Sequence, residues 1–426
     1  MAAAVAVAVV RPHRLPSLTG MRFAAAASVF AFHASFAGVF ADAGTQHRLA
    51  QVLAKAGWVG VSFFFVLSGF VLTWSARPGE RAHRFWRRRL AKIYPSHLVT
   101  ALAAFVLLAA TAAAPGPGAV AVNVTLLQSF FPQPHLYVSG NPVSWSLSCE
   151  LLFYLAFPLL WRALRALPAR ALAPVAAGLA AVVMALPAAV ALLPATPALV
   201  LPDGTTGQWQ YWLLYVFPPV RAAEFALGMV VARIVREGRW RGPRPLPAAL
   251  LLGAGYVLAT QLPYLAGLVA ATVVPIALLI GALAHADATG RPTPLAGPVW
   301  VRLGELSFAL YLVHRLVLIH GHQALGRRAF STPAALLVLA AAFTVSLLLA
   351  ALLYHAVEKP AMRLLAVSAK HRENTPAIPA EIRRLGQLAG MKGHSLPAPE
   401  GLRILKPLPG QRRPPKGVDD ERPRRP

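Results

Sequence analysis

The sequence predicts an all-α polytopic membrane protein, a bundle of about ten transmembrane helices with both termini in the cytoplasm. Of its 426 residues, 57% are hydrophobic and 13% are charged, whereas soluble domains carry roughly 25% charged residues. Several apolar runs reach the roughly 20 residues that a helix needs to cross the hydrocarbon core of a bilayer. Basic residues gather in alternate loops between these runs, and this asymmetry sets the orientation.

Ten apolar segments are the predicted spans. They cover residues 19–40, 57–76, 93–113, 145–162, 171–194, 211–232, 246–262, 264–284, 303–322 and 334–357. Only the three residues from Gln261 to Pro263 divide the seventh span from the eighth.

Lys and Arg are concentrated in the loops that follow the even-numbered spans. Loop 77–92 alone holds Arg77, Arg81, Arg84, Arg87, Arg88, Arg89 and Lys92. On the opposite side, segment 114–144 has no Lys, Arg, Asp or Glu, and segment 195–210 has only Asp203. Because short cytoplasmic loops carry the excess of Lys and Arg, this pattern indicates that both termini are cytoplasmic.

The sequence divides into three parts. A basic N-terminal segment covers 1–14, the membrane domain covers 15–367, and a Pro- and Arg-rich tail covers 368–426. We expect the tail to be disordered and cytoplasmic, and to contact anionic lipids of the bilayer together with the basic loops. The net charge of +26 lies in these loops and the tail, so no nucleic-acid partner is expected.

The sequence lacks the motifs of disulfide, metal and nucleotide-cofactor chemistry. Cys149 is the only cysteine, which rules out an intramolecular disulfide or a cysteine metal cluster. The sequence has no metal-ligand motif, no Walker-type loop and no dinucleotide fingerprint. We therefore expect no metal and no permanently bound cofactor.

Arg22 and His33 are the strongly polar residues of the first span. Eleven residues at roughly 100° each bring both side chains to one helix face, about 16 Å apart along the axis. Polar groups at membrane depth are costly and often functional. The alternative is an arginine that snorkels at the helix end and a hydrogen-bonded core histidine.

Glu150 lies in the fourth span, with Tyr154 one turn away on the same face. The predicted topology places Glu150 and His33 at similar depth in the outer half of the membrane. A carboxylate that orients an imidazole is the usual arrangement for a general base that deprotonates a hydroxyl. Alternatively, Glu150 and Tyr154 only cross-link helices.

Further polar side chains face the predicted bundle interior. Arg221 and Glu224 are three residues apart, and a structural ion pair is the favoured interpretation. Ser307, Tyr311 and His314 form a polar stripe on the ninth span, of the kind that faces other helices. The additional candidates for polar residues along the path through the bundle are Trp145, Ser148, Tyr154, Arg221, Glu224, Tyr311, His314 and Glu358.

The basic cluster after the second span contains Arg87, Arg88, Arg89 and Lys92 beside Phe85, Trp86 and Tyr94. Topology explains several of these charges. Cations beside aromatic rings also suit a ligand that has both phosphates and a base. Coenzyme A, with its adenine and about four negative charges, matches such a site.

Taken together, these residues resemble the acyltransferase 3 family of membrane O-acyltransferases, over about 15–365. The motifs are Arg22-x10-His33, the stretch Gly57–Phe70, Arg89-x-x-Lys92, Trp145-Ser146-Leu147-Ser148-x-Glu150, Arg221-x-x-Glu224, Tyr311-Leu312-x-His314 and Glu358-x-Pro360-x-x-Arg363. Lys92 stands where the family has a second arginine, and a lysine keeps the charge but loses the bidentate fork.

The resemblance implies a multi-pass enzyme of the bacterial cytoplasmic membrane. Its donor would be cytoplasmic acyl-CoA, with acetyl-CoA as the default. Its acceptor would be a sugar or polyol hydroxyl, on a macrolide-like metabolite or a cell-envelope glycan. The phosphates of the donor would be held by the cofactor-binding set Arg22, Arg88, Arg89 and Lys92.

The catalytic pair would be His33 and Glu150. His33 would act as a general base or take the acyl group itself, and Glu150 would orient it. A transporter that uses the same Arg, His and Glu residues as a proton or substrate path is the alternative. A non-catalytic membrane scaffold for the basic tail is a third interpretation.

Overall fold

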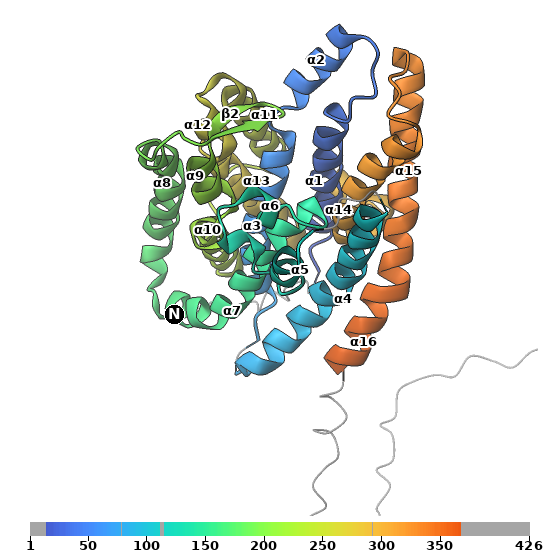
Figure 1. The fold of residues 1–426 in the computed structure, drawn as a ribbon. Coiled ribbons are helices and arrows are strands. Elements are labelled where there is room, and N and C mark those ends of the chain that lie inside the picture. Colours follow the sequence, from blue (N-terminus) through green and yellow to red (C-terminus); the bar gives the residue numbers. More distant parts are fainter. Residues whose placement is uncertain (1–13, 78, 111–114, 292, 368–426) are drawn as a thin grey trace, which may run out of the picture. The chain divides into compact units, whose positions relative to one another are not determined.

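The computed structural model describes residues 14–367 except residues 78, 111–114 and 292. The predicted tail 368–426, and all but the last residue of the predicted segment 1–14, lie outside the described residues. The described part of the chain is almost entirely helical (Figure 1).

In chain order, the helices are α1 (Pro16–Ser35), α2 (Ala43–Leu53), α3 (Ala56–Trp74), α4 (Ala82–Ala109), α5 (Pro117–Val124), α6 (Pro134–Tyr137), α7 (Trp145–Ala166), α8 (Leu172–Val190), α9 (Gln208–Tyr211), α10 (Pro218–Arg236), α11 (Pro245–Gln261), α12 (Tyr264–Val269), α13 (Val273–Ala288), α14 (Pro298–Ala324), α15 (Thr332–Leu353) and α16 (Lys359–Val367). Two π-helical turns, Trp212–Val216 and Tyr354–Glu358, precede α10 and α16. Short 3₁₀ turns cover Gln128–Phe130, Pro142–Ser144, Ala169–Ala171 and Pro294–Ala296.

Eight helical stretches among the described residues are long and apolar enough to cross a membrane. A helix also occupies each of the ten predicted segments, but α1 and α11 are not among the eight. Helix α11 has only 17 residues, and Arg22 and His33 lower the mean hydropathy of α1. The chain is therefore an all-α membrane protein, while the number of ten spans and the cytoplasmic location of the termini stay predictions.

Helix α4 begins eleven residues before the predicted third span, at Ala82 rather than residue 93. The basic cluster that was predicted to lie in a loop is thus helical. Arg, Leu, Lys and Ala are good helix formers, and Pro95 lies inside the helix without ending it. As a consequence, successive basic residues of the cluster point in different directions around α4.

Helices α3 and α10 pack backbone to backbone through two glycines. A Cβ atom on Gly69 would overlap the carbonyl oxygen of Phe225, and one on Gly228 would overlap the carbonyl oxygen of Val66. Small residues permit this close approach in membrane bundles.

The ion pair of Arg221 and Glu224 also holds α10 against α3. The two side chains are 2.8 Å apart and at most 2% exposed. Arg221 donates to the hydroxyl of Ser62 on α3 at 2.9 Å, and its guanidinium lies 4.6 Å from the ring centre of Tyr215. These contacts fit the structural interpretation of the pair.

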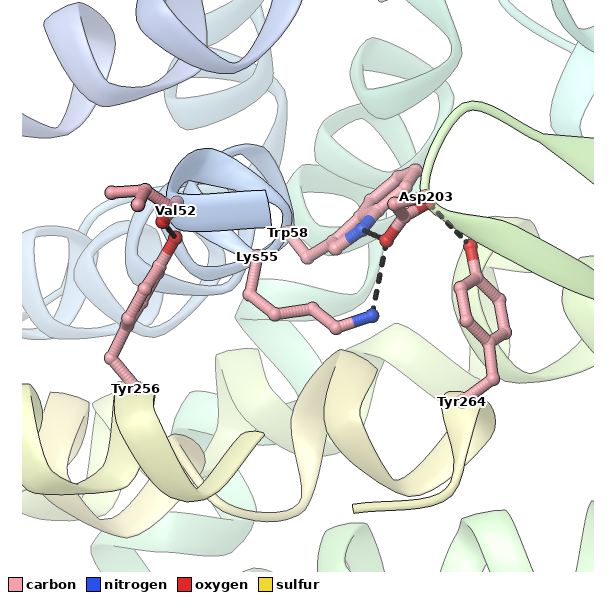
Figure 2. Close-up of polar contacts among 6 residues, drawn as sticks. All are labelled: Val52, Lys55, Trp58, Asp203, Tyr256 and Tyr264. Carbon is pink, nitrogen blue, oxygen red and sulfur yellow. Dashed lines mark hydrogen bonds and ion pairs between the residues drawn. The ribbon is translucent and has the colours of Figure 1, made fainter. Parts of the chain in front are cut away.

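A two-stranded antiparallel hairpin, β1 (Ala198–Leu201) and β2 (Gly204–Gly207), carries Asp203 in its turn. Figure 2 shows the Asp203 carboxylate between three donors. It forms a 3.0 Å ion pair with Lys55 and accepts hydrogen bonds from Trp58 Nε1 and the Tyr264 hydroxyl, both at 2.8 Å. Because both charged side chains are at most 7% exposed, this hairpin is firmly attached to α3 and α12.

Candidate active site

A cavity of about 160 Å³ lies between α1, α3, α4, α7 and α14, and we name it the central cavity. Most of its wall is aliphatic or aromatic. Its polar lining residues are Arg22, Ser68, Arg89, Lys92, Ser146, Glu150, Tyr154 and Tyr311. The cavity therefore gathers polar residues from five helices that are far apart in the sequence.

Three cations line the central cavity. The side chain of Arg22, on α1, has no hydrogen-bond or ion-pair partner among the described residues. Within the described part of the chain, the side chain of Arg89 makes a single hydrogen bond, a long one of 3.4 Å to the Ser75 hydroxyl. Lys92 forms an ion pair with Glu358, which the π-helical turn before α16 presents to it. Arg22 and Arg89 thus keep most of their hydrogen-bonding capacity for a ligand.

Arg88 does not line the central cavity, although the sequence grouped it with Arg22, Arg89 and Lys92. Its guanidinium forms a 2.7 Å ion pair with Glu80. The helical conformation of this segment explains the difference, because adjacent residues on a helix point roughly 100° apart.

Glu150 lies in the central cavity and does not contact His33, contrary to the sequence prediction. Its carboxylate accepts a hydrogen bond from the Ser68 hydroxyl at 2.9 Å and another from Tyr154. Arg89 and Arg22 line the same cavity, and their positive charges favour the ionised carboxylate of Glu150.

The depth of α7 explains why this pairing was predicted wrongly. Segment 117–144 folds back into the bundle, and the side-chain amide of Asn141 donates to the carbonyl oxygen of Leu312 at 2.7 Å. Helix α7 thus begins at the depth of the middle of α14, where the hydroxyls of Ser146 and Tyr311 lie 2.9 Å apart. Glu150, four residues after Ser146, is about 6 Å nearer the end of the cavity that holds Arg22.

His33 instead pairs with His314, with 3.0 Å between Nδ1 of His33 and Nε2 of His314. Nδ1 of His314 lies 3.1 Å from the carbonyl oxygen of Leu310. A carbonyl can only accept, so His314 carries its proton on Nδ1 and its Nε2 must accept. His33 then donates from Nδ1, and its own Nε2 keeps a free lone pair.

The imidazole pair lies just beyond one end of the central cavity. Tyr311 lines the cavity and precedes His314 by one helical turn on α14, with ring centres 5.9 Å apart. Arg22 lies toward the opposite end of α1, about 16 Å from His33 along the helix axis. The arrangement can therefore hold an anionic group at one end and a proton-accepting nitrogen at the other.

The remaining candidates have mainly structural contacts. Trp145 packs against Tyr215, with ring centres 5.2 Å apart, and Ser148 is fully buried outside the cavity lining. Ser68 and Ser146 are cavity residues that sequence reasoning did not single out. Ser68 lies in the stretch Gly57–Phe70, and Ser146 lies in the motif that begins at Trp145. Their contacts in the cavity depend on how the helices pack, which the sequence does not show.

The site is thus a cavity with three cations in an all-α membrane bundle, with an imidazole pair just beyond it. The model of the family described as "Acyltransferase domain" matches residues 15–355. The chain belongs to this acyltransferase 3 family and is a membrane O-acyltransferase.

Two curated proteins are similar to the chain. Acyltransferase MdmB of Streptomyces mycarofaciens is 44% identical over 366 residues, which cover 83% of this chain and 92% of MdmB. Peptidoglycan O-acetyltransferase OatA of Listeria monocytogenes is 31% identical over 88 residues, which cover 19% of this chain and 12% of OatA. No solved structure matches the chain.

Proposed function

We propose that the protein transfers an acyl group, by default acetyl, from cytoplasmic acyl-CoA to a hydroxyl of a sugar-containing acceptor. The observation that carries this proposal is the placement of Arg22 and His33 on one helix, with the central cavity running beside it. The phosphates of CoA would bind at the Arg22 end, and the pantetheine arm would extend toward Nε2 of His33.

The donor end would hold phosphate through Arg22, Arg89 and Lys92. The planar guanidinium groups offer paired donors to phosphate oxygens, whereas the lysine ammonium acts as a point charge. Glu358 keeps Lys92 in place, and Glu150 and Tyr154 set the polar environment on the α7 side. Arg88, bound to Glu80, would contribute only to the surrounding field.

The reaction follows from the free lone pair on His33 Nε2. This nitrogen takes the proton of the acceptor hydroxyl while the hydroxyl oxygen attacks the thioester carbonyl. The tetrahedral intermediate then breaks its carbon–sulfur bond, and the CoA thiolate takes the proton from His33. His314 accepts a hydrogen bond from Nδ1 of His33 throughout, and so holds the ring in the orientation and tautomer that the step requires.

A covalent route uses the same nitrogen. Nε2 of His33 attacks the thioester carbonyl, and CoA leaves as a thiolate. The acceptor hydroxyl then attacks the acyl-imidazole, which releases Nε2, and the hydroxyl proton passes through Nε2 to the CoA thiolate. In this order of steps, the CoA thiol would stay on the cytoplasmic side while the acyl group moves from His33 to the acceptor hydroxyl.

The orientation follows from the distribution of basic residues. With ten spans and both termini in the cytoplasm, Arg22 and the basic cluster of α4 lie at the cytoplasmic face of the bacterial membrane. The basic loops and the tail would contact anionic lipids there. The local similarity to a peptidoglycan O-acetyltransferase supports acetyl as the acyl group and a glycan hydroxyl as the acceptor.

The test uses purified full-length protein in phosphatidylcholine nanodiscs with radiolabelled acetyl-CoA and a panel of acceptors. It measures label on the acceptor together with free CoA. Stoichiometric CoA and acylated product would support the proposal. Movement of a solute with no CoA release would contradict it and favour a transporter.

A further inference from the structure

A second cavity, of about 410 Å³, lies at the C-terminal ends of α1 and α14. Phe36, three residues after His33, lines it, and so does Arg315, the residue directly after His314. The central cavity ends at Tyr311, one turn before His314. The imidazole pair therefore lies between residues that line the two cavities, one turn after Tyr311 of the central cavity and next to Arg315 of the second cavity.

The polar lining of the second cavity is basic. It consists of Arg315, His322, Gln323 and Arg327, without any carboxylate. The guanidinium groups of Arg315 and Arg327 have no hydrogen-bond or ion-pair partner among the described residues. Arg315 is half-buried at membrane depth, where an unpaired cation is costly unless a ligand compensates it.

Of the other two polar residues, His322 uses its donor within the protein, and Gln323 keeps a free donor. His322 Nε2 lies 3.1 Å from the carbonyl oxygen of Arg328 and therefore donates to it. The side-chain oxygen of Gln323 lies 2.9 Å from Nδ1 of His320, so its amide NH₂ group stays free to donate. Two guanidinium groups and an amide together offer many donors and two positive charges.

We propose that the second cavity is the acceptor site, and that it binds an acceptor through a carboxylate or phosphate group. This inference rests on the proposed function, because it places the acceptor hydroxyl on the side of His33 opposite the donor. Arg315 and Arg327 would bind the acidic group, while the neighbouring hydroxyl reaches Nε2 of His33. The acid can belong to a soluble acceptor or to a lipid headgroup, since both present the same oxygens.

The first experiment measures anion binding without any acyl transfer. Full-length protein in phosphatidylcholine nanodiscs is saturated with CoA, so that the central cavity is occupied, and is titrated with inorganic phosphate against chloride at constant ionic strength. Phosphate should raise the Tm of the unmodified protein. Arg327→Gln and Arg315→Gln should each weaken phosphate binding about tenfold or more, because each removes a charge-assisted contact.

Arg328→Gln is the matched control. Arg328 is exposed and adjacent to Arg327, but it does not line the cavity, so its variant should respond to phosphate as the unmodified protein does. Should Arg315→Gln fail to fold, Arg327→Gln still tests the site, because Arg327 is exposed. Equal phosphate responses of Arg327→Gln and Arg328→Gln would overturn the proposal.

A second arm identifies the source of the acid. Nanodiscs that contain phosphatidylglycerol are analysed by native mass spectrometry for retained lipid. Retention that Arg327→Gln abolishes and Arg328→Gln preserves supports a lipid-borne acceptor, and a phosphate response without retention supports a soluble one. Absence of both effects overturns the proposal. Failure of acetyl-CoA to release CoA in the transfer assay contradicts the proposed function alone, because the comparison of Arg327→Gln with Arg328→Gln needs no turnover.

Discussion

Nδ1 of His33 lies 3.0 Å from Nε2 of His314, and this contact joins α1 to α14 beyond the end of the central cavity. Since the carbonyl of Leu310 fixes the proton of His314 on Nδ1, the pair leaves Nε2 of His33 as the nitrogen with a free lone pair. The helix packing thus determines which nitrogen of His33 can act as a base.

His33→Ala should abolish acyl transfer. The variant removes the proposed base or acyl carrier, while the three cations of the donor end stay in place, so binding of CoA should be unchanged. Radiolabel transfer and the Kd of CoA are the two measurements. Transfer near the normal rate in folded, CoA-binding protein would rule out both catalytic routes.

His314→Ala should lower kcat about 100-fold, a typical loss for an acid–base partner, and leave the KM for acetyl-CoA unchanged. His314→Gln should recover part of the rate, because the side-chain oxygen of glutamine can accept the hydrogen bond from Nδ1 of His33. A structural role alone predicts that the rates of the two variants follow their Tm values, so kcat and Tm are measured together.

Arg89→Gln should raise the KM for acetyl-CoA about tenfold through loss of one charge-assisted phosphate contact. The matched control is Arg88→Gln, which changes the adjacent residue. Because Arg88 is paired with Glu80 outside the cavity, its KM should change less than about twofold, as expected for a partly exposed pair. Equal effects of the two variants would show that the general positive charge of α4, and not the cavity, binds the donor.

Asp203→Ala should destabilise the protein by about 3–5 kcal/mol, because it leaves Lys55 as an uncompensated buried charge. Glu237→Gln, which breaks the more exposed pair with Arg233, should cost about 0–1 kcal/mol. Reversible unfolding in detergent micelles measures both. Similar losses of unfolding free energy in the two variants would show that burial of the Lys55–Asp203 pair does not increase its contribution to stability.

Gly69→Ala should destabilise the protein by about 1–3 kcal/mol or more, since the added methyl group overlaps the backbone of α10. Gly253→Ala in α11 is the opposite case. A Cβ atom there meets open space, so the change should stabilise the helix by about 0.5–1 kcal/mol. Unfolding experiments on both variants measure the change in the free energy of unfolding. Opposite signs would show that the close α3–α10 packing, and not the loss of a glycine, causes the destabilisation.

The helical spans could be predicted from the sequence because each depends on a local run of apolar residues. Arg22 and His33 share a helix, so their common face also follows from spacing alone. The partner of His33 could not be predicted in this way. It depends on the depth at which α7 starts, and that depth depends on a segment that folds into the bundle and binds α14 through Asn141.

The roles of the basic residues of α4 could not be predicted from the sequence either. Arg88 and Arg89 are indistinguishable as neighbours in a loop, and both were predicted to have the same role. Once the helix begins at Ala82, the two point in different directions, and only Arg89 lines the cavity. The helix propensities of Arg, Leu, Lys and Ala favour a helix here, but basic residues before an apolar span are also the pattern of a cytoplasmic loop.

The glycine contact between α3 and α10 holds the α3 side of the central cavity in place, whereas α4 can bend. Val61, Phe64, Ser68 and Leu72 line it from α3, and α3 cannot move closer to α10 because their backbones already touch at Gly69 and Gly228. Helix α4 contributes Arg89, Lys92 and Ile93 to the cavity lining. It also contains Pro95, which has no backbone N–H to donate, so α4 lacks one backbone hydrogen bond. We therefore expect the donor to be accommodated by bending of α4, with α3 as the fixed frame.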